Sequence, residues 1–225
     1  MQYIDYFKFP DGEREFDFFL SIKRKCYDNF YPFQVLPQKG LMRLDFEPIT
    51  ILYGGNGSGK TTVLNIMAEK LTISRESAYN RSSFFSDYLP LCDYDSADET
   101  PETQKIITSD DVFDYMLNLR ALNEGIDLKR ELLFEEYLDA KYSDFKMRSL
   151  EDYHVLKKVN QARSKTQSKF VRANLMSNIK GQSNGESAFK YFTDTIMPGG
   201  LYLLDEPENS LSASNQVALA AFLEE

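Results

Sequence analysis

Residues 54–62 read Gly-Gly-Asn-Gly-Ser-Gly-Lys-Thr-Thr, and this stretch decides the fold that we expect. It matches the pattern Gly-x-x-x-x-Gly-Lys-Ser/Thr, in which glycines let consecutive backbone N–H groups turn toward phosphate oxygens. The apolar run 49–53 (ITILY) precedes it, and apolar residues at helical spacing follow it in 60–71. A strand, a glycine-rich loop and a helix in this order predict an α/β fold with a phosphate-binding loop.

Each residue type in this loop has a definite expected role. Lys60 supplies a cation for the outer phosphates, and the Thr61 hydroxyl is an oxygen ligand of the kind that Mg²⁺ prefers. A chance glycine-rich turn is the alternative, and the strand, helix, Lys and Thr together disfavour it. The residues expected to bind the nucleotide here are Gly55, Asn56, Gly57, Ser58, Gly59, Lys60, Thr61 and Thr62.

A second stretch places two carboxylates directly after an apolar strand. Residues 200–205 (GLYLLD) have the composition of a buried parallel strand, and Glu206 follows them. Ligands of open α/β sheets lie at the carboxyl ends of strands. We therefore expect Asp205 to hold the water shell of Mg²⁺ and Glu206 to orient or deprotonate a water that attacks the terminal phosphate. Without the upstream loop, this pair would be interpreted as surface acids.

Together, GGNGSGKTT and LYLLDEPENSLS resemble the ATP-binding cassette type of P-loop ATPase. Residues 183–187 (SNGES) lie between them and resemble the signature motif of the non-transporter branch. This resemblance extends to stand-alone bacterial predicted ATPases related to SMC, RecF and OLD-type heads. It implies that Ser183, Gly185 and Glu186 contact the nucleotide held by an opposite subunit, where a helix N-terminus favours anions.

The resemblance implies a cytoplasmic enzyme that binds Mg²⁺ and ATP and hydrolyses ATP to ADP and phosphate. Lys60 and Glu206 would be its catalytic residues, and ATP would drive a head-to-tail homodimer, in DNA repair, chromosome maintenance or phage defence. One alternative is an ATP-binding regulatory module that serves a partner effector without efficient turnover. Another is the nucleotide-binding subunit of a transporter, which the SNGE signature disfavours.

Three family features depart from the usual pattern. Residues 210–213 (SLSA) occupy the place of the loop after the acidic pair but lack its Asp, and the sole His of the chain, His154, lies in the insertion. We expect the family's switch His, with at least one more sheet strand, to lie beyond this chain. The candidates for the glutamine that would touch Mg²⁺ are Gln104, Gln161 and Gln167.

The sequence predicts one truncated domain over residues 1–225, with a mostly parallel central sheet flanked by helices and an antiparallel N-terminal β part. Its expected parts are an N-terminal core (1–86), an acidic connection with a helical insertion (87–174), and a core with the signature and acidic strand (175–225). The expected strands are 16–22, 41–46 and 49–53, with a loop at 29–33. Helices are expected at 60–71, 111–123 (capped by Ser109 and stopped by Gly125), 127–142 and from 151.

Charge argues against a protein that coats nucleic acid generally, because 26 Lys and Arg face 35 Asp and Glu. Residues 153–185, however, contain seven Lys and Arg and no acid. This block is equally typical of a solvated helix face and of a phosphate-binding face. If it binds nucleic acid across the dimer, charge reversal at Lys157, Lys158 and Arg163 weakens that binding; an effector protein is the other partner that we consider for the insertion.

The remaining features concern compartment and the adenine base. Cys26 and Cys92 fit no disulfide or zinc pattern and are interpreted as reduced thiols of a cytosolic protein. No run of 18 apolar residues predicts a membrane span. Tyr31 and Phe33 are candidates for an exposed platform under adenine, and packing on the sheet is an equal alternative.

Overall fold

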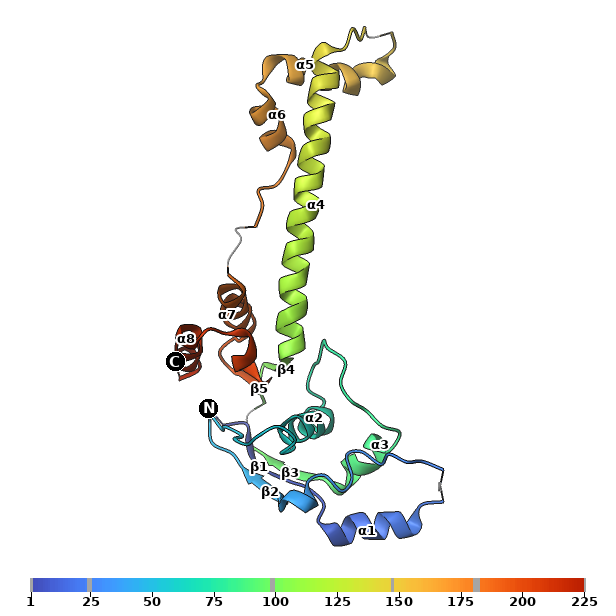
Figure 1. Cartoon of the computed structure of the whole chain (residues 1–225), viewed down its shortest axis with the longest axis vertical. Helices are drawn as coiled ribbons and strands as arrows, with labels where there is room; N and C mark the ends of the chain where they lie inside the picture. The colour runs from blue at the N-terminus through green and yellow to red at the C-terminus, as the bar shows by residue number, and fades with distance from the viewer. Residues whose placement is uncertain (1, 24–25, 98–99, 147, 180–182, 225) are drawn as a thin grey trace. The chain divides into compact units, whose positions relative to one another are not determined.

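The computed structural model describes residues 2–23, 26–97, 100–146, 148–179 and 183–224. The chain forms two compact units, which we call unit 1 (Met1–Phe113 with Asn184–Glu225) and unit 2 (Asp114–Ser183). It is an α/β protein with an antiparallel sheet, a small parallel sheet and helices (Figure 1). The finer assignment to the P-loop cassette fold and the three-part division of the domain stay predictions.

The antiparallel sheet of unit 1 has the order β2-β1-β3. Strand β1 (Ile4–Lys8) pairs with β2 (Arg43–Asp45) on one side and with β3 (Asp93–Ser96) on the other. The expected strand at 41–46 is thus confirmed in its central part. The stretch expected to be an acidic connection also contains strands: β3 pairs its backbone with β1 while its side chains stay exposed, and residues 103–108 form a second strand.

The parallel sheet pairs β4 (Thr103–Thr108) with β5 (Gly200–Asp205). The register runs from Thr103 opposite Gly200 to Thr108 opposite Asp205, so the two strands end side by side. Ser74 adds a parallel bridge on the other side of β4. The parallel strand expected at 200–205 is confirmed, and its acid lies at a carboxyl end as predicted. The expectation that it is buried was wrong, because β5 pairs with β4 alone among the described residues and Leu203 is its one buried side chain.

Two expected strands are absent. Residues 16–22 lie mostly in α1 (Gly12–Ser21), which starts where the Asp11 carboxylate accepts a hydrogen bond of 2.9 Å from the N–H of Arg14. Residues 49–53 have no strand pairing, and their first two residues belong to a turn in which the Thr50 hydroxyl bonds the backbone of Glu47. Ile51 and Tyr53 are accordingly 83% and 101% exposed. Apolar composition predicted both strands, but a strand also needs a neighbouring edge.

Helix α2 (Lys60–Lys70) is confirmed and supplies the centre of the unit 1 core. Its apolar face buries Val63, Ile66 and Met67. The same cluster contains Phe84 and the buried residues of α3 (Phe85–Tyr88). Short 3₁₀ turns η1 (Pro37–Lys39), η2 (Leu89–Leu91) and η4 (Pro207–Ser210), with helices α7 (Asn184–Thr195) and α8 (Ala213–Glu224), complete unit 1.

Unit 2 is helical. Helix α4 (Ser109–Tyr142) begins in unit 1 and continues through unit 2 without interruption, so the expected stop at Gly125 was wrong: the interior of a long helix tolerates one glycine at a cost of about 1 kcal/mol. Turn η3 (Leu150–Asp152) and helices α5 (Tyr153–Ser164) and α6 (Gln167–Asn174) follow. Its core cluster is formed by Leu133, Tyr137, Ala140, Val159, Ala162, Phe170 and Val171.

Two general expectations can be compared with the described residues. None of their helices combines the length and the apolar character that crossing a membrane requires. Cys26 is exposed, Cys92 is buried, and both are free thiols.

Candidate functional site

The glycine-rich loop carries its lysine folded over its own backbone. Lys60, the first residue of α2, donates from Nζ to the carbonyl oxygens of Gly54 at 2.6 Å and Gly55 at 3.2 Å. A turn bond of 3.2 Å from the Ser58 N–H to the Gly55 carbonyl closes the loop beneath it. The loop therefore places a positive charge and a helix N-terminus at the same point, an arrangement that favours anions.

Glycine is required at several points of this loop. Gly57 and Gly59 have φ values of +75° and +99°, which side chains rarely adopt. A Cβ on Gly54 would lie 2.7 Å from the Ser58 hydroxyl oxygen. That buried hydroxyl has no hydrogen-bond partner among the described residues. A buried polar group without a partner calls for an explanation, and a phosphate oxygen bound in the loop is the kind of acceptor that would satisfy it.

The loop helix meets the acidic strand through one hydrogen bond. Thr61 lies in the first turn of α2 and donates from Oγ1 to the Oδ1 of Asp205 at 3.1 Å, although 144 positions separate the two residues. Burial raises the pKa of Asp205 above its ordinary value; the bond from Thr61 opposes this rise and the charge of Glu206 adds to it. A hydroxyl and a carboxylate side by side are hard oxygen ligands suited to Mg²⁺.

Glu206 has a left-handed backbone, with φ 51° and ψ 48°, at the point where β5 turns into η4. Its carboxylate accepts a 2.6 Å hydrogen bond from the side-chain amide of Asn209. Strained conformations of this kind cluster at functional sites, where the surrounding structure holds them. The acid therefore has a fixed orientation directly after Asp205.

The signature segment lies at the start of α7, and its glycine packs against the segment after η4. Ser183 and Glu186 are exposed around the first residues of α7. A Cβ on Gly185 would lie 3.3 Å from the side-chain nitrogen of Asn215 and 3.4 Å from the backbone nitrogen of Ser212. The neighbours of Gly185 thus belong to the segment after η4. Of the three sequence motifs, the structure joins the loop and the acidic strand directly.

A polar cluster at the carboxyl end of β4 was not predicted. Asp111 is buried and accepts hydrogen bonds from the N–H of Thr108 at 2.7 Å and from its hydroxyl at 2.8 Å. The Thr108 hydroxyl also lies 2.9 Å from that of Ser77. Thr108 is the register partner of Asp205, so this cluster lies beside the candidate metal ligand. The pattern Thr-x-x-Asp at a helix start was the available signal.

None of the three candidates for the glutamine that would touch Mg²⁺ lies at the junction between β4 and α4. Gln104 lies within β4, and its backbone carbonyl accepts a bond from Ser74. Gln161 lies on α5 and Gln167 begins α6, both in unit 2. His154 is an exposed residue of α5.

The expected adenine platform is only partly present. Of the two alternatives for Phe33, the structure supports packing: the ring is buried and stacks on Phe18 of α1, with ring centroids 4.4 Å apart. Tyr31 is half-buried, and its hydroxyl lies 3.3 Å from that of Thr62 in α2. Tyr31 thus remains beside the loop helix.

Comparisons of this chain with protein families, with curated proteins and with solved structures found no match.

Proposed function

We propose that this chain is a cytoplasmic Mg²⁺-dependent ATPase of the ATP-binding cassette type, non-transporter branch, that hydrolyses ATP to ADP and phosphate. The observation that supports this most is the hydrogen bond between Thr61 and Asp205, because two motifs recognised separately in the sequence meet there. The partnerless hydroxyl of Ser58 within the glycine-rich loop supports the same proposal.

The residues fit a nucleotide phosphate group with Mg²⁺. The loop from Gly55 to Gly59, with Lys60 and Thr62, would hold the phosphates, while Thr61 and Asp205 would hold the metal. At this place the metal would supply positive charge to phosphate oxygens. Mg²⁺ commonly uses one or two protein carboxylates together with phosphates and waters, so this small ligand set suffices.

Glu206 would orient or deprotonate the attacking water. Its backbone geometry places the carboxylate directly after Asp205. Lys60 would stabilise the negative charge of the transferred phosphate and would exchange its bonds to Gly54 and Gly55 for bonds to phosphate oxygens.

Dimerisation is the second part of the proposal. Ser183 and Glu186 are exposed at the start of α7, and Gly185 lies beside Asn215 rather than the loop. In a head-to-tail pair, Ser183, Gly185 and Glu186 of one copy would face the nucleotide of the other copy. ATP would then act as the ligand that holds two copies together.

The test combines ATP hydrolysis with oligomeric state, measured with and without Mg-ATP. We expect slow turnover by the unmodified chain and loss of turnover in Glu206→Gln, which would accumulate an ATP-dependent dimer. Glu208→Gln, at an exposed acid two residues further on, is the matched control and should keep turnover. Equal turnover in Glu206→Gln and the unmodified chain would contradict the assignment of Glu206.

A binding module without efficient turnover is the second candidate. It is favoured by the bond from Asn209, which engages the carboxylate that the hydrolytic mechanism needs. In that case the unmodified chain and Glu206→Gln would both bind ATP and dimerise without hydrolysis. Asn209→Ala distinguishes the two functions, since it would start turnover only if this bond holds Glu206 back.

A further inference from the structure

Positive charge is concentrated in unit 2, whose residues the proposed ATPase site does not use. Unit 2 has 13 Lys and Arg against 10 Asp and Glu, whereas the rest of the chain has 13 against 25. From Tyr153 to Ser183 there is no acidic residue at all. The stretch that contains α5 and α6 is therefore positively charged, and the sign of this charge is opposite to that of unit 1.

Of the three cations considered in the sequence, two bond to other residues of unit 2 and the third is Lys157. Lys158 forms an ion pair of 2.6 Å with Glu136 of α4, and Arg163 donates to the carbonyl of Ser143 at 2.6 Å. These two contacts join α5 to α4 and to the residue that follows α4. Lys157 makes no ion pair with any residue that the structure describes, and it is exposed. We therefore keep Lys157 alone of the three as a candidate for binding nucleic acid.

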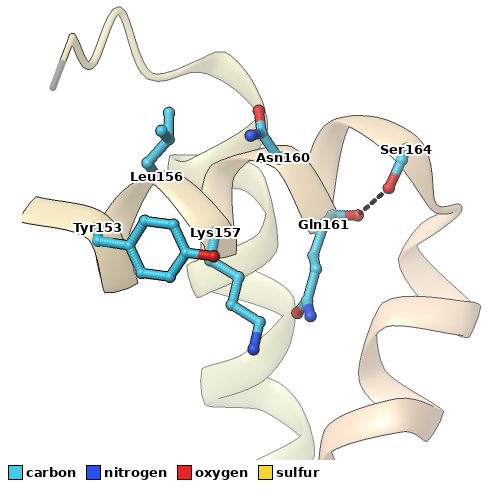
Figure 2. Close-up of a pocket in the computed structure, with 6 residues that line it drawn as sticks. All are labelled: Tyr153, Leu156, Lys157, Asn160, Gln161 and Ser164. Carbon is cyan, nitrogen blue, oxygen red and sulfur yellow. Dashed lines mark hydrogen bonds between the residues drawn. The ribbon is translucent and has the colours of Figure 1, made fainter.

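Lys157 lies on a shallow hollow of about 420 Å³ along one face of α5. The lining residues are Tyr153, Leu156, Lys157, Asn160, Gln161 and Ser164, and most follow the three- and four-residue spacing of a helix face. Figure 2 shows the Tyr153 ring beside the Lys157 side chain, with Gln161 extending from the next turn of the same helix. Tyr153 is 61% exposed, so one face of its ring is accessible from solvent.

We propose that this face of α5 binds single-stranded nucleic acid. Tyr153 offers a ring on which an unpaired base stacks, and Lys157 offers a cation to the adjoining phosphate. The amides of Asn160 and Gln161 can both donate to and accept from base edges. Lys165, Lys169 and Arg172 continue the acid-free stretch and raise the local potential.

A single strand fits this chemistry better than a duplex. Paired bases hide their ring faces, so Tyr153 could not stack on them, and duplex binding draws mainly on several cations along the groove. This hollow has one lysine, with a ring and two amides beside it. The proposed binding of a single strand needs no ATP and involves unit 2 alone, so it can be tested separately from ATP hydrolysis.

The experiment measures fluorescence anisotropy of a labelled single-stranded oligonucleotide of mixed sequence titrated with the full chain, without nucleotide, at several salt concentrations. Tyr153→Ala is expected to weaken binding roughly 5- to 100-fold, whereas Tyr153→Phe keeps the ring and keeps the affinity. Lys157→Glu is expected to weaken binding several-fold and to reduce the salt slope by about 1. Lys129→Glu, an equal charge change at an exposed residue of α4, is the control and should bind nearly as the unmodified chain does.

Four outcomes would overturn the proposal. They are no binding of the oligonucleotide even at low salt, tighter binding of the matching duplex, equal losses in Lys157→Glu and Lys129→Glu, and displacement of the oligonucleotide by an acidic peptide at equal charge. The last result would show that the face recognises acidic protein segments. Retained affinity in Tyr153→Phe with loss in Tyr153→Ala would support base stacking directly.

Discussion

At the scale of single residues, Glu206 combines a strained backbone with the expected catalytic role. It is a non-glycine residue with positive φ, together with Gln34 and Thr72 among the described residues. A left-handed conformation costs a residue with a Cβ about 1–2 kcal/mol. The structure therefore holds an acid at a position where glycine would be more stable, which is the pattern expected where function and stability compete.

We predict that Glu206→Gly is about 1 kcal/mol more stable than Glu206→Ala, because only glycine adopts this backbone freely. Both variants lose the carboxylate and the bond from Asn209, so their difference isolates the backbone term. Urea unfolding measures it, and both variants should lack ATP turnover. Equal midpoints for the two variants would show that φ at Glu206 carries no strain.

Glu15 is a second residue whose environment has a measurable consequence. It is only 3% exposed; its Oε2 accepts a 2.6 Å bond from the N–H of Gln34, and its Oε1 has no partner among the described residues. Burial raises the pKa of this carboxyl, although the bond from Gln34 acts in the opposite direction. The folded state therefore keeps the proton to a higher pH than the unfolded state.

This difference fixes the sign of the pH dependence. Just above pH 4.5 the folded state binds more protons, so the free energy of unfolding falls as the pH rises through the raised pKa of Glu15. We predict that Glu15→Gln removes this dependence and is more stable at neutral pH by about 1 kcal/mol. Thermal unfolding at acidic and neutral pH measures it. Glu13→Gln, at an exposed residue of the same helix turn, is the control; a matching pH profile would disprove the role of Glu15.

At the scale of elements, the spacing of apolar residues predicted a helix or strand correctly where it fitted one type of element only. Helix α2 and strand β5 were predicted because their apolar residues repeat at helical spacing or run together. Helix α1 was not, since 16–22 is also rich in aromatic residues typical of strands. The capping carboxylate of Asp11 was the signal that favours a helix there.

The remaining element errors arose from long-range pairing. Strand β3 forms from an acidic stretch because β1, almost ninety positions away, provides its ladder. Residues 49–53 have a better strand composition but have no ladder partner among the described residues. Neither outcome is encoded locally, because pairing between distant segments depends on which edges the fold brings together.

Helix α4 offers a direct test of local propensity. Gly125 lies in its interior, and a Cβ there would meet no atom within 4 Å. We predict that Gly125→Ala stabilises the helix by about 0.5–1 kcal/mol, because alanine loses less backbone freedom on folding. Slower hydrogen exchange of the α4 amides would report it.

The matched control reverses the change on the same helix. Ala121→Gly replaces an exposed alanine one turn earlier and should cost a similar amount. If both variants exchange like the unmodified chain, Gly125 does not limit the stability of α4, and the expected stop at this position would have had no energetic basis.

At the scale of the whole molecule, the sequence indicated which two distant segments meet at the candidate site. The sequence assigned Thr61 and Asp205, 144 positions apart, to one Mg²⁺ site, and the structure brings the two side chains within hydrogen-bond distance; the metal itself stays a prediction. The cluster of Ser77, Thr108 and Asp111 beside it was missed, since its residues are common types and only the β4–β5 register brings them to the site.

The two units have separate buried clusters with no residue in common. We predict that Phe170→Ala, at a fully buried ring of unit 2, costs about 3–5 kcal/mol there and leaves ATP affinity unchanged. Phe84→Ala, at an equally buried ring in the cluster that contains α2, should instead weaken ATP binding. Hydrogen exchange of α2 and of α4 to α6, with ATP titrations, compares the two variants. Loss of protection in α2 caused by Phe170→Ala would show that the chain unfolds as one cooperative body, because damage to one cluster would then lower the stability of the other.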